Sequence, residues 1–247
     1  MPARPYVLII AGFDPSSGAG ITADLKTFEQ HKVYGLGVCS AITFQNESEF
    51  EGVEWISPES IMRQLDILFS KYTIAFAKIG LIENLEVLNR VVDFLQLQGC
   101  KVVWDPILRA SAGYIIHSDF DNSLLRSVLS RIYLLTPNLP EFDFIKKQVN
   151  SIDILDLLDQ THLNAILLKG GHAVDEDCCD VLYHNGAKTL LKGDRISGAK
   201  HGTGCVLSSA IVSNLASGYS LTAACKSAKA YVEHFISSNQ TLLGYHS

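Results

Sequence analysis

Short apolar segments alternate with longer segments of helical periodicity along most of this chain. The apolar segments, which read as buried strands, include residues 6–12, 75–80, 101–104 and 165–169. Strands and helices that alternate in this way form a mostly parallel sheet with helices on both faces. Two further short strands flank Asn185-Gly186, the dipeptide most typical of a tight β-hairpin. We therefore predict an α/β protein of three layers, α/β/α, with a small antiparallel hairpin near one edge of the sheet.

Composition is consistent with one large core. Of the 247 residues, 47% are hydrophobic, and no repeat, low-complexity tract or linker divides them, so we expect one domain over residues 1–247. The net charge is −6, and no dense run of Lys or Arg indicates a nucleic-acid partner. The apolar run at residues 6–11 is too short to span a membrane and is soon followed by Asp14 rather than a cleavage site. Six cysteines without a Cys-x-x-Cys pair indicate free thiols and a cytoplasmic location.

Polar side chains stand at or just after the ends of several predicted strands. Ligands of parallel sheets bind beyond the carboxyl ends of the strands, so these residues predict a site at that edge. They are Asp14, Gln45, Lys78, Asp105, Asn138, Glu141 and Lys169.

A glycine-rich segment, His201-Gly202-Thr203-Gly204-Cys205, precedes an apolar helix of small residues. Glycines let the backbone approach a ligand, and the unpaired N–H groups of a helix start favour negative charge. Cys205 would lie in the first helical turn, where the dipole is expected to lower the pKa of its thiol. The alternative is a tightly packed helix start with a buried cysteine.

Two other motifs allow both a structural and a functional interpretation. Asn138 and Glu141 follow Thr136-Pro137 and could cap a helix or hold Mg²⁺ through its water shell. Lys169 precedes Gly170 and could be an exposed lysine before a turn or a phosphate contact. The P-loop, dinucleotide and nucleophile-elbow motifs do not occur in the sequence.

Several motifs in order carry a resemblance to a known family. They are Ala11 to Lys26, Gln45-Asn46, Lys78-Ile79-Gly80, Asp105-Pro106, Thr136 to Glu141, Lys169 to His172, and His201 to Cys205. Along almost the whole chain the sequence resembles the hydroxymethylpyrimidine/phosphomethylpyrimidine kinases of thiamine biosynthesis. The resemblance implies a ribokinase-like fold, phosphorylation of a small-molecule pyrimidine by ATP with Mg²⁺, and a homodimer.

The resemblance also implies roles for individual residues. Gln45 would bind the pyrimidine edge, and the substrate-binding set is Gly12, Asp24, Thr43, Gln45 and Ile107. The nucleotide set is Asn138, Lys169 and Thr203, and the magnesium set is Asp105 and Glu141, assisted by Asn138. The catalytic set is Gly202, Thr203, Gly204 and Cys205, in which Cys205 faces the hydroxymethyl group where sugar-kinase relatives carry an aspartate. A loose phosphoryl-transfer transition state needs charge neutralisation more than a strong base. We therefore expect residues Gly202 to Gly204, the glycine turn, to contribute more to catalysis than Cys205.

The chain departs from the family pattern at several positions. Phe13, Ser17 and Phe44 replace residues that are usually smaller or different there, and Arg109 lies near a position that usually carries lysine. The change near Arg109 bears on how a phosphorylated substrate would be held. Two other functions are compatible with the sequence, a pyridoxal kinase of the same fold and a non-catalytic pyrimidine sensor.

Overall fold

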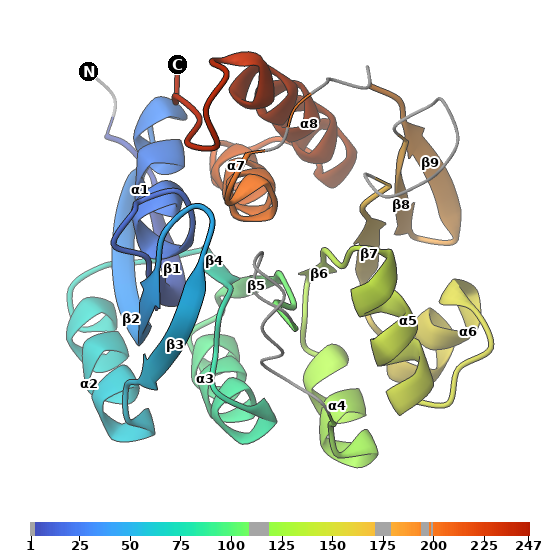
Figure 1. The fold of residues 1–247 in the computed structure, drawn as a ribbon. Coiled ribbons are helices and arrows are strands. Elements are labelled where there is room, and N and C mark those ends of the chain that lie inside the picture. Colours follow the sequence, from blue (N-terminus) through green and yellow to red (C-terminus); the bar gives the residue numbers. More distant parts are fainter. Residues whose placement is uncertain (1–2, 109–118, 171–178, 194–197, 199) are drawn as a thin grey trace.

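The computed structural model describes the chain except for residues 1–2, 109–118, 171–178, 194–197 and 199 (Figure 1). Its strands are β1 (Tyr6–Phe13), β2 (Tyr34–Gln45), β3 (Phe50–Trp55), β4 (Phe76–Ile79), β5 (Lys101–Trp104), β6 (Leu134–Leu135), β7 (Ala165–Leu168), β8 (Asp180–His184) and β9 (Ala187–Leu191). Its helices are α1 (Gly20–Gln30), α2 (Pro58–Phe69), α3 (Leu85–Leu97), α4 (Asn122–Leu129), α5 (Leu139–Gln148), α6 (Ile154–Thr161), α7 (Thr203–Ala216) and α8 (Leu221–Ser237).

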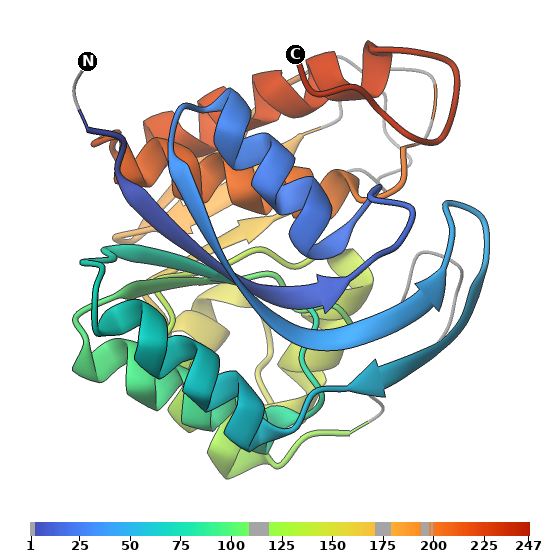
Figure 2. The same ribbon diagram turned by 90° about the vertical axis from the view of Figure 1, so that its left-hand side faces the viewer.

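The strands form one sheet in the order β3-β2-β1-β4-β5-β6-β7-β8-β9. Neighbours from β2 to β7 pair in parallel, whereas β3, β8 and β9 pair antiparallel. Helices α1, α7 and α8 cover one face, and α2 to α6 cover the other (Figures 1 and 2). The predicted three-layer architecture with a mostly parallel sheet and an edge hairpin is confirmed.

Each face of the sheet has its own apolar core, which explains the continuous apolar runs in the sequence. Along β1, Val7 and Ile9 pack with Phe28 of α1 and the apolar side of α7, whereas Leu8 and Ile10 pack toward α2 and α3. Alternate residues therefore enter different cores, and all four are fully buried. No helix in the described part of the chain is long and apolar enough to cross a membrane.

The predicted hairpin at Asn185-Gly186 is confirmed as the β8–β9 turn, and both turn residues have positive φ, 51° and 70°. Two elements were not predicted. Strand β3 pairs antiparallel with β2 at the opposite edge, so the sheet has antiparallel strands at both edges rather than one. Helix α6 was also missed.

Candidate active site

The glycine-rich segment forms the sharp entry into α7. Gly202 is the N-cap residue, with φ 75°, and a Cβ atom there would lie 2.0 Å from the Gly18 carbonyl oxygen. The first hydrogen bond of the helix runs from the Val206 N–H to the Gly202 carbonyl, 2.9 Å. The N–H groups of the three residues between them therefore precede the helical ladder, as an anion seat requires.

The β1–α1 loop supports this entry from the side. The Asp14 carboxylate accepts hydrogen bonds from the Ser16 and Ala19 backbones, each 2.8 Å, and lies 3.0 Å from His201 Nε2. Burial would raise the pKa of Asp14, but the hydrogen bonds from His201, Ala19 and Ser16 hold it below its ordinary value. Asp14 thus joins the first loop of the chain to the segment before α7.

A second cluster stands opposite the glycine turn. Lys169 follows β7, and its Nζ lies 2.9 Å from Asp105 Oδ1 and 3.8 Å from Glu141 Oε2. A Cβ atom at Gly204 would lie 3.5 Å from Lys169 Nζ and 3.7 Å from Asp105 Oδ2. The exposed-lysine interpretation is wrong, since Lys169 joins both carboxylates beside the start of α7.

The pKa values of the two carboxyl groups in this cluster shift in opposite directions. Burial would raise the pKa of Asp105, but the charges of Lys169 and Lys78 lower it. Asp105 also accepts hydrogen bonds from Thr136 Oγ1, 3.1 Å, and Ser208 Oγ, 3.2 Å. Burial raises the pKa of Glu141 to about 7, because the attraction of Lys169 only partly opposes it.

Asn138 and Glu141 form a capping box at the start of α5. The Asn138 side chain accepts from the Glu141 N–H, 2.9 Å, and Glu141 Oε2 accepts from the Asn138 N–H, 2.8 Å. The helix-cap interpretation is therefore confirmed. The cap does not exclude a role of Glu141 in holding Mg²⁺, because Glu141 also faces Lys169.

The donor chemistry of the cluster fits Mg²⁺. Among the described residues, no group of three or more His, Cys, Asp or Glu side chains could hold a metal ion. Mg²⁺ typically binds through one or two carboxylates together with substrate phosphates and water. Asp105 and Glu141 supply such a pair beside a lysine and a helix start.

Cys205 is buried, and the expected lowering of its pKa is wrong. Burial raises the pKa of its thiol to about 11, although the Lys78 charge and a hydrogen bond from the Gly20 backbone act in the opposite direction. Desolvation of the thiolate outweighs the helix dipole here. Cys205 is therefore a neutral thiol at physiological pH.

Three of the predicted substrate residues lie around the ends of β1 and β2. Gln45 Nε2 donates to Thr43 Oγ1, 2.9 Å, which donates to the Phe13 carbonyl, 2.9 Å. In the described part of the chain, Gln45 Oε1 and the second amide hydrogen have no hydrogen-bond partner. A Cβ atom at Gly12 would lie 2.8 Å from Leu81 and 3.5 Å from Thr43, so glycine at this position lets Leu81 pack closely against the end of β1.

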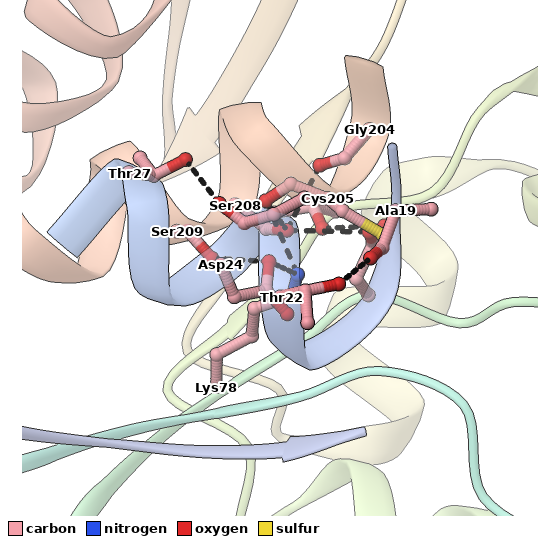
Figure 3. A network of polar contacts seen from close by, with 12 residues as sticks. Ala19, Thr22, Asp24, Thr27, Lys78, Gly204, Cys205, Ser208 and Ser209 are labelled. Carbon is pink, nitrogen blue, oxygen red and sulfur yellow. Dashed lines mark hydrogen bonds and ion pairs between the residues drawn. The ribbon is translucent and has the colours of Figure 1, made fainter. Parts of the chain in front are cut away.

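The other two predicted substrate residues, Ile107 and Asp24, belong to other segments of the chain. Ile107 follows β5, and its Cδ1 would be 3.7 Å from a Cβ atom at Gly80. Asp24 has no exposed surface, and its carboxylate is bound by Lys78 and Ser209. A direct contact between Asp24 and a substrate is not what this geometry supports; Asp24 lies beneath the first turns of α7 (Figure 3).

Sequence reasoning missed the buried partners of the site. Lys78 reads as a strand-end residue, yet it lies inside β4 and is fully buried. The signal for it was a single charge within the apolar segment Phe76–Ile79. His201, Thr136 and Ser208 also contact site carboxylates, and nothing in their spacing indicates it. Arg109, Gly171 and His172 lie outside the described residues.

Comparison with known proteins agrees with this geometry. The family model for phosphomethylpyrimidine kinase matches residues 14–247. The chain is 35% identical to the hydroxymethylpyrimidine/phosphomethylpyrimidine kinase of Rhizobium meliloti, over 95% of this chain and 91% of that protein.

Solved structures of two kinases have a fold similar to that of this chain. The phosphomethylpyrimidine kinase of Clostridium difficile superposes with a TM-score of 0.75 at 30% identity, over 93% of this chain and 98% of that one. An ADP complex of Bacillus subtilis pyridoxal kinase gives a TM-score of 0.81 at 26% identity, over 97% and 94%. The fold is thus ribokinase-like, and the chain belongs to the phosphomethylpyrimidine kinase family, whose members are phosphotransferases.

Proposed function

We propose that this protein transfers the γ-phosphoryl group of ATP to 4-amino-5-hydroxymethyl-2-methylpyrimidine, and then phosphorylates the monophosphate to the diphosphate. Gln45 carries the substrate assignment. An aminopyrimidine presents a ring-nitrogen acceptor beside an amino donor. The second amide hydrogen and the carbonyl oxygen of Gln45, which have no partner among the described residues, match both. The bond to Thr43 fixes the amide plane before substrate binds.

The phosphate side of the site uses the glycine turn and Lys169. We assign the N–H groups of Thr203 and Gly204 and the Lys169 ammonium to the transferring phosphates. The support is that Lys169 Nζ lies 3.5 Å from the position of a Cβ atom at Gly204, beside the helix start to which these N–H groups belong. The Asn138 side chain belongs to the same nucleotide set through its position at the start of α5. Solved relatives that bind ADP support ATP as the donor.

We assign Asp105 and Glu141 to Mg²⁺, which when bound neutralises phosphate charge. The acceptor hydroxyl oxygen gains a bond to the γ-phosphorus as the bond to ADP breaks, and the hydroxyl proton is released to water by way of a phosphoryl oxygen. A loose transition state needs little help from a base, which agrees with a neutral Cys205. We propose that the Cys205 thiol shapes the space beside the hydroxymethyl group rather than removing its proton.

Further proposals concern the whole chain. We propose one domain over residues 1–247, supported by the continuous sheet, and a homodimer, which sedimentation equilibrium would test. We also propose a cytoplasmic location, since every cysteine in the described part of the chain is free.

Pyridoxal kinase is the second candidate, because a pyridoxal kinase superposes so well on the chain. Pyridoxal lacks the adjacent donor and acceptor, since its phenolic oxygen and ring nitrogen lie on separate edges. A buried amide left half-paired costs about 1–3 kcal/mol, or roughly 5- to 150-fold in preference for the pyrimidine. A sensor without catalysis would not require the cluster around Lys169.

Turnover of purified protein with the hydroxymethylpyrimidine, its monophosphate and pyridoxal tests this proposal. We expect the highest kcat/KM for the pyrimidine, and we expect Gln45→Leu to reduce that value much more than the value for pyridoxal. Phe44→Leu is the matched control, because Phe44 is an exposed neighbour of Gln45 and any stacking by its ring would serve either substrate. A higher kcat/KM for pyridoxal, or an equal loss for both substrates in Gln45→Leu, would replace the pyrimidine assignment with pyridoxal.

A further inference from the structure

A fully buried ion pair lies directly beneath the glycine turn. Lys78 of β4 and Asp24 of α1 approach to 2.5 Å between Nζ and Oδ1, and neither side chain has exposed surface. Lysine and aspartate are rarely buried without a partner, and each is the partner of the other here. The pair lies where β1 and β4 are neighbours, the point at which strand order reverses in the sheet.

Stability alone gives little reason for such a pair. Taking both charges out of water is so unfavourable that replacing a buried pair with apolar residues is often neutral or stabilising. The desolvation is visible at Asp24, whose pKa burial raises above its ordinary value despite the Lys78 charge. The remaining contacts of the pair therefore indicate its role.

Those contacts lead to the start of α7. Lys78 Nζ also donates to the Cys205 carbonyl oxygen, 3.1 Å, and Ser209 Oγ donates to Asp24 Oδ1, 2.6 Å. Figure 3 shows Lys78 and Asp24 grouped with Cys205, Ser208 and Ser209. Lys78 of the central sheet thus contacts both α1, at Asp24, and the first turn of α7, at Cys205.

The bonded carbonyl belongs to the same turn as the proposed phosphate donors. Thr203 and Gly204 precede Val206, which donates the first helical hydrogen bond, so their N–H groups are not part of the helical hydrogen-bond ladder. The Cys205 carbonyl shares one planar peptide unit with the Val206 N–H, which donates to the Gly202 carbonyl. Holding the Cys205 carbonyl therefore fixes the peptide unit that closes the first turn, in which the N–H groups of Thr203 and Gly204 lie. The ammonium also keeps its charge, since Asp24 and nearby acids raise the pKa of Lys78 against the effect of burial.

We propose that Lys78 is a positioning residue for phosphoryl transfer: by holding the Cys205 carbonyl, it aims the N–H groups of the glycine turn at the transferring phosphoryl group. This inference rests on the proposed kinase function. Lys78 does not contact substrate, so it acts on the transition state only through the turn. Asp24 keeps the ammonium in place, which gives that residue a role in place of the substrate contact predicted for it.

Two variants and a control separate the orientation of the N–H groups in the glycine turn from the stability of the whole protein. Lys78→Met removes the charge and leaves Asp24 unpaired, so the variant should unfold at a lower temperature. Lys78→Met with Asp24→Asn removes both charges and should recover most of the parent's thermal stability. Leu95→Ala, in the core beneath α3 on the other face of the sheet, is a destabilised control with an intact turn.

We expect the double variant to keep about a 10²-fold loss in kcat, the size typical of a small misplacement at a reaction centre. The KM for the acceptor should stay within about threefold of the parent, because substrate binding is untouched. Binding of ADP with aluminium fluoride, a mimic of the transferring group, should weaken by a factor similar to the kcat loss, and ADP alone should bind as before. The Leu95→Ala control should keep the parent kcat at a temperature where it is folded.

Recovery of the parent kcat in the double variant would overturn the proposal, and so would unchanged affinity for ADP with aluminium fluoride. A loss of kcat in Leu95→Ala equal to that in Lys78→Met would also overturn it. Failure of the substrate assignment is distinguishable, because the parent protein alone reports it. If the parent prefers pyridoxal, the same ratios between variants and parent are measured with pyridoxal.

Discussion

Gly202 and Gly204 are two residues apart, but the structure gives them different reasons to be glycine. Gly202 has positive φ, and a side chain there would overlap the Gly18 carbonyl, whereas the Cβ position of Gly204 has ordinary clearance beside Lys169. The backbone requires glycine at position 202, and we propose that glycine at position 204 keeps free the space that a phosphate would fill.

Alanine at each position should therefore give opposite results. We expect Gly202→Ala to lower the unfolding temperature, since both the clash and the left-handed backbone oppose it. Gly204→Ala keeps the backbone N–H and should unfold as the parent does, but its methyl group would occupy the space beside Lys169. By displacing the phosphate from the turn it should cost about 10²- to 10³-fold in kcat, the size of the effect of losing one anion-hole contact. Thermal unfolding and steady-state kinetics on the pair check this, and a parent-like kcat in Gly204→Ala would remove the anion-seat assignment.

The state of Cys205 gives a prediction about pH. Because burial raises its pKa to about 11, the thiolate fraction rises about tenfold per pH unit between pH 7 and 9.5. If the thiolate were the base, kcat/KM would rise in proportion. We expect no such rise, and we expect Cys205→Ser to lose less than the ~10²-fold at the lower end of general-base effects. A tenfold rise per unit in the parent, absent in the serine variant, would restore Cys205 as the base.

Among the elements, α5 begins with a residue that serves two purposes. Glu141 closes the capping box and faces Lys169. Its pKa is raised to about 7 by burial, so the folded protein favours the protonated form. The resulting stability is fully present below the unfolded pKa, near 4.5, and is lost as pH rises through about 7.

Glu141→Gln should keep the cap, because an amide oxygen can accept from the Asn138 N–H, and should remove this pH dependence. We expect the unfolding temperature of the parent, relative to the variant, to fall between pH 4.5 and 7. At pH 7.5 the variant should require more Mg²⁺ for half-maximal rate. A magnesium titration and thermal unfolding at several pH values measure both, and an unchanged rate and Mg²⁺ requirement would leave Glu141 as a cap only.

Elements with a clear pattern were predictable from the sequence, and elements without one were not. Lys101–Trp104 and the Asn185-Gly186 turn were placed correctly, since burial on both faces and positive φ leave strong signals. Strand β3 is an edge strand in which every side chain is partly or fully exposed, so it has no apolar run to detect. In the site, polar residues at strand ends were found, but the burial of Lys78 and Asp24 depends on how α1 and α7 pack over β1 and β4. The thiol of Cys205 was misjudged because a sequence shows the helix dipole but not the desolvation that exceeds it.

The whole molecule has two cores, and only one supports the glycine turn directly. Leu95 of α3 belongs to the core on one face, and Ile211 of α7 belongs to the other. Both side chains are fully buried, so truncation to alanine should cost about 2–5 kcal/mol of unfolding free energy in either case.

Activity should separate these two truncations. At a temperature where both variants are folded, we expect Leu95→Ala to keep the parent kcat and Ile211→Ala to reduce it, because only the second loosens the helix that begins at the turn. Denaturant unfolding first measures the unfolding free energies of the two variants, and kcat is then compared at equal stability. Equal kcat values in two variants of equal stability would contradict a special link between this core and catalysis.

The β2–β3 hairpin extends past the end of β1, whose last residue pairs with Ile42 (Figure 2). Gln45 and Thr43 therefore lie on a ribbon whose outer strand lies at the edge of the sheet, while Asp105, Lys169 and the glycine turn come from later segments of the chain. Insertions or substitutions in such a ribbon leave both cores intact. On the proposed site assignment, substitutions in this one hairpin would change which alcohol the protein accepts, while the residues proposed to bind phosphate would stay the same.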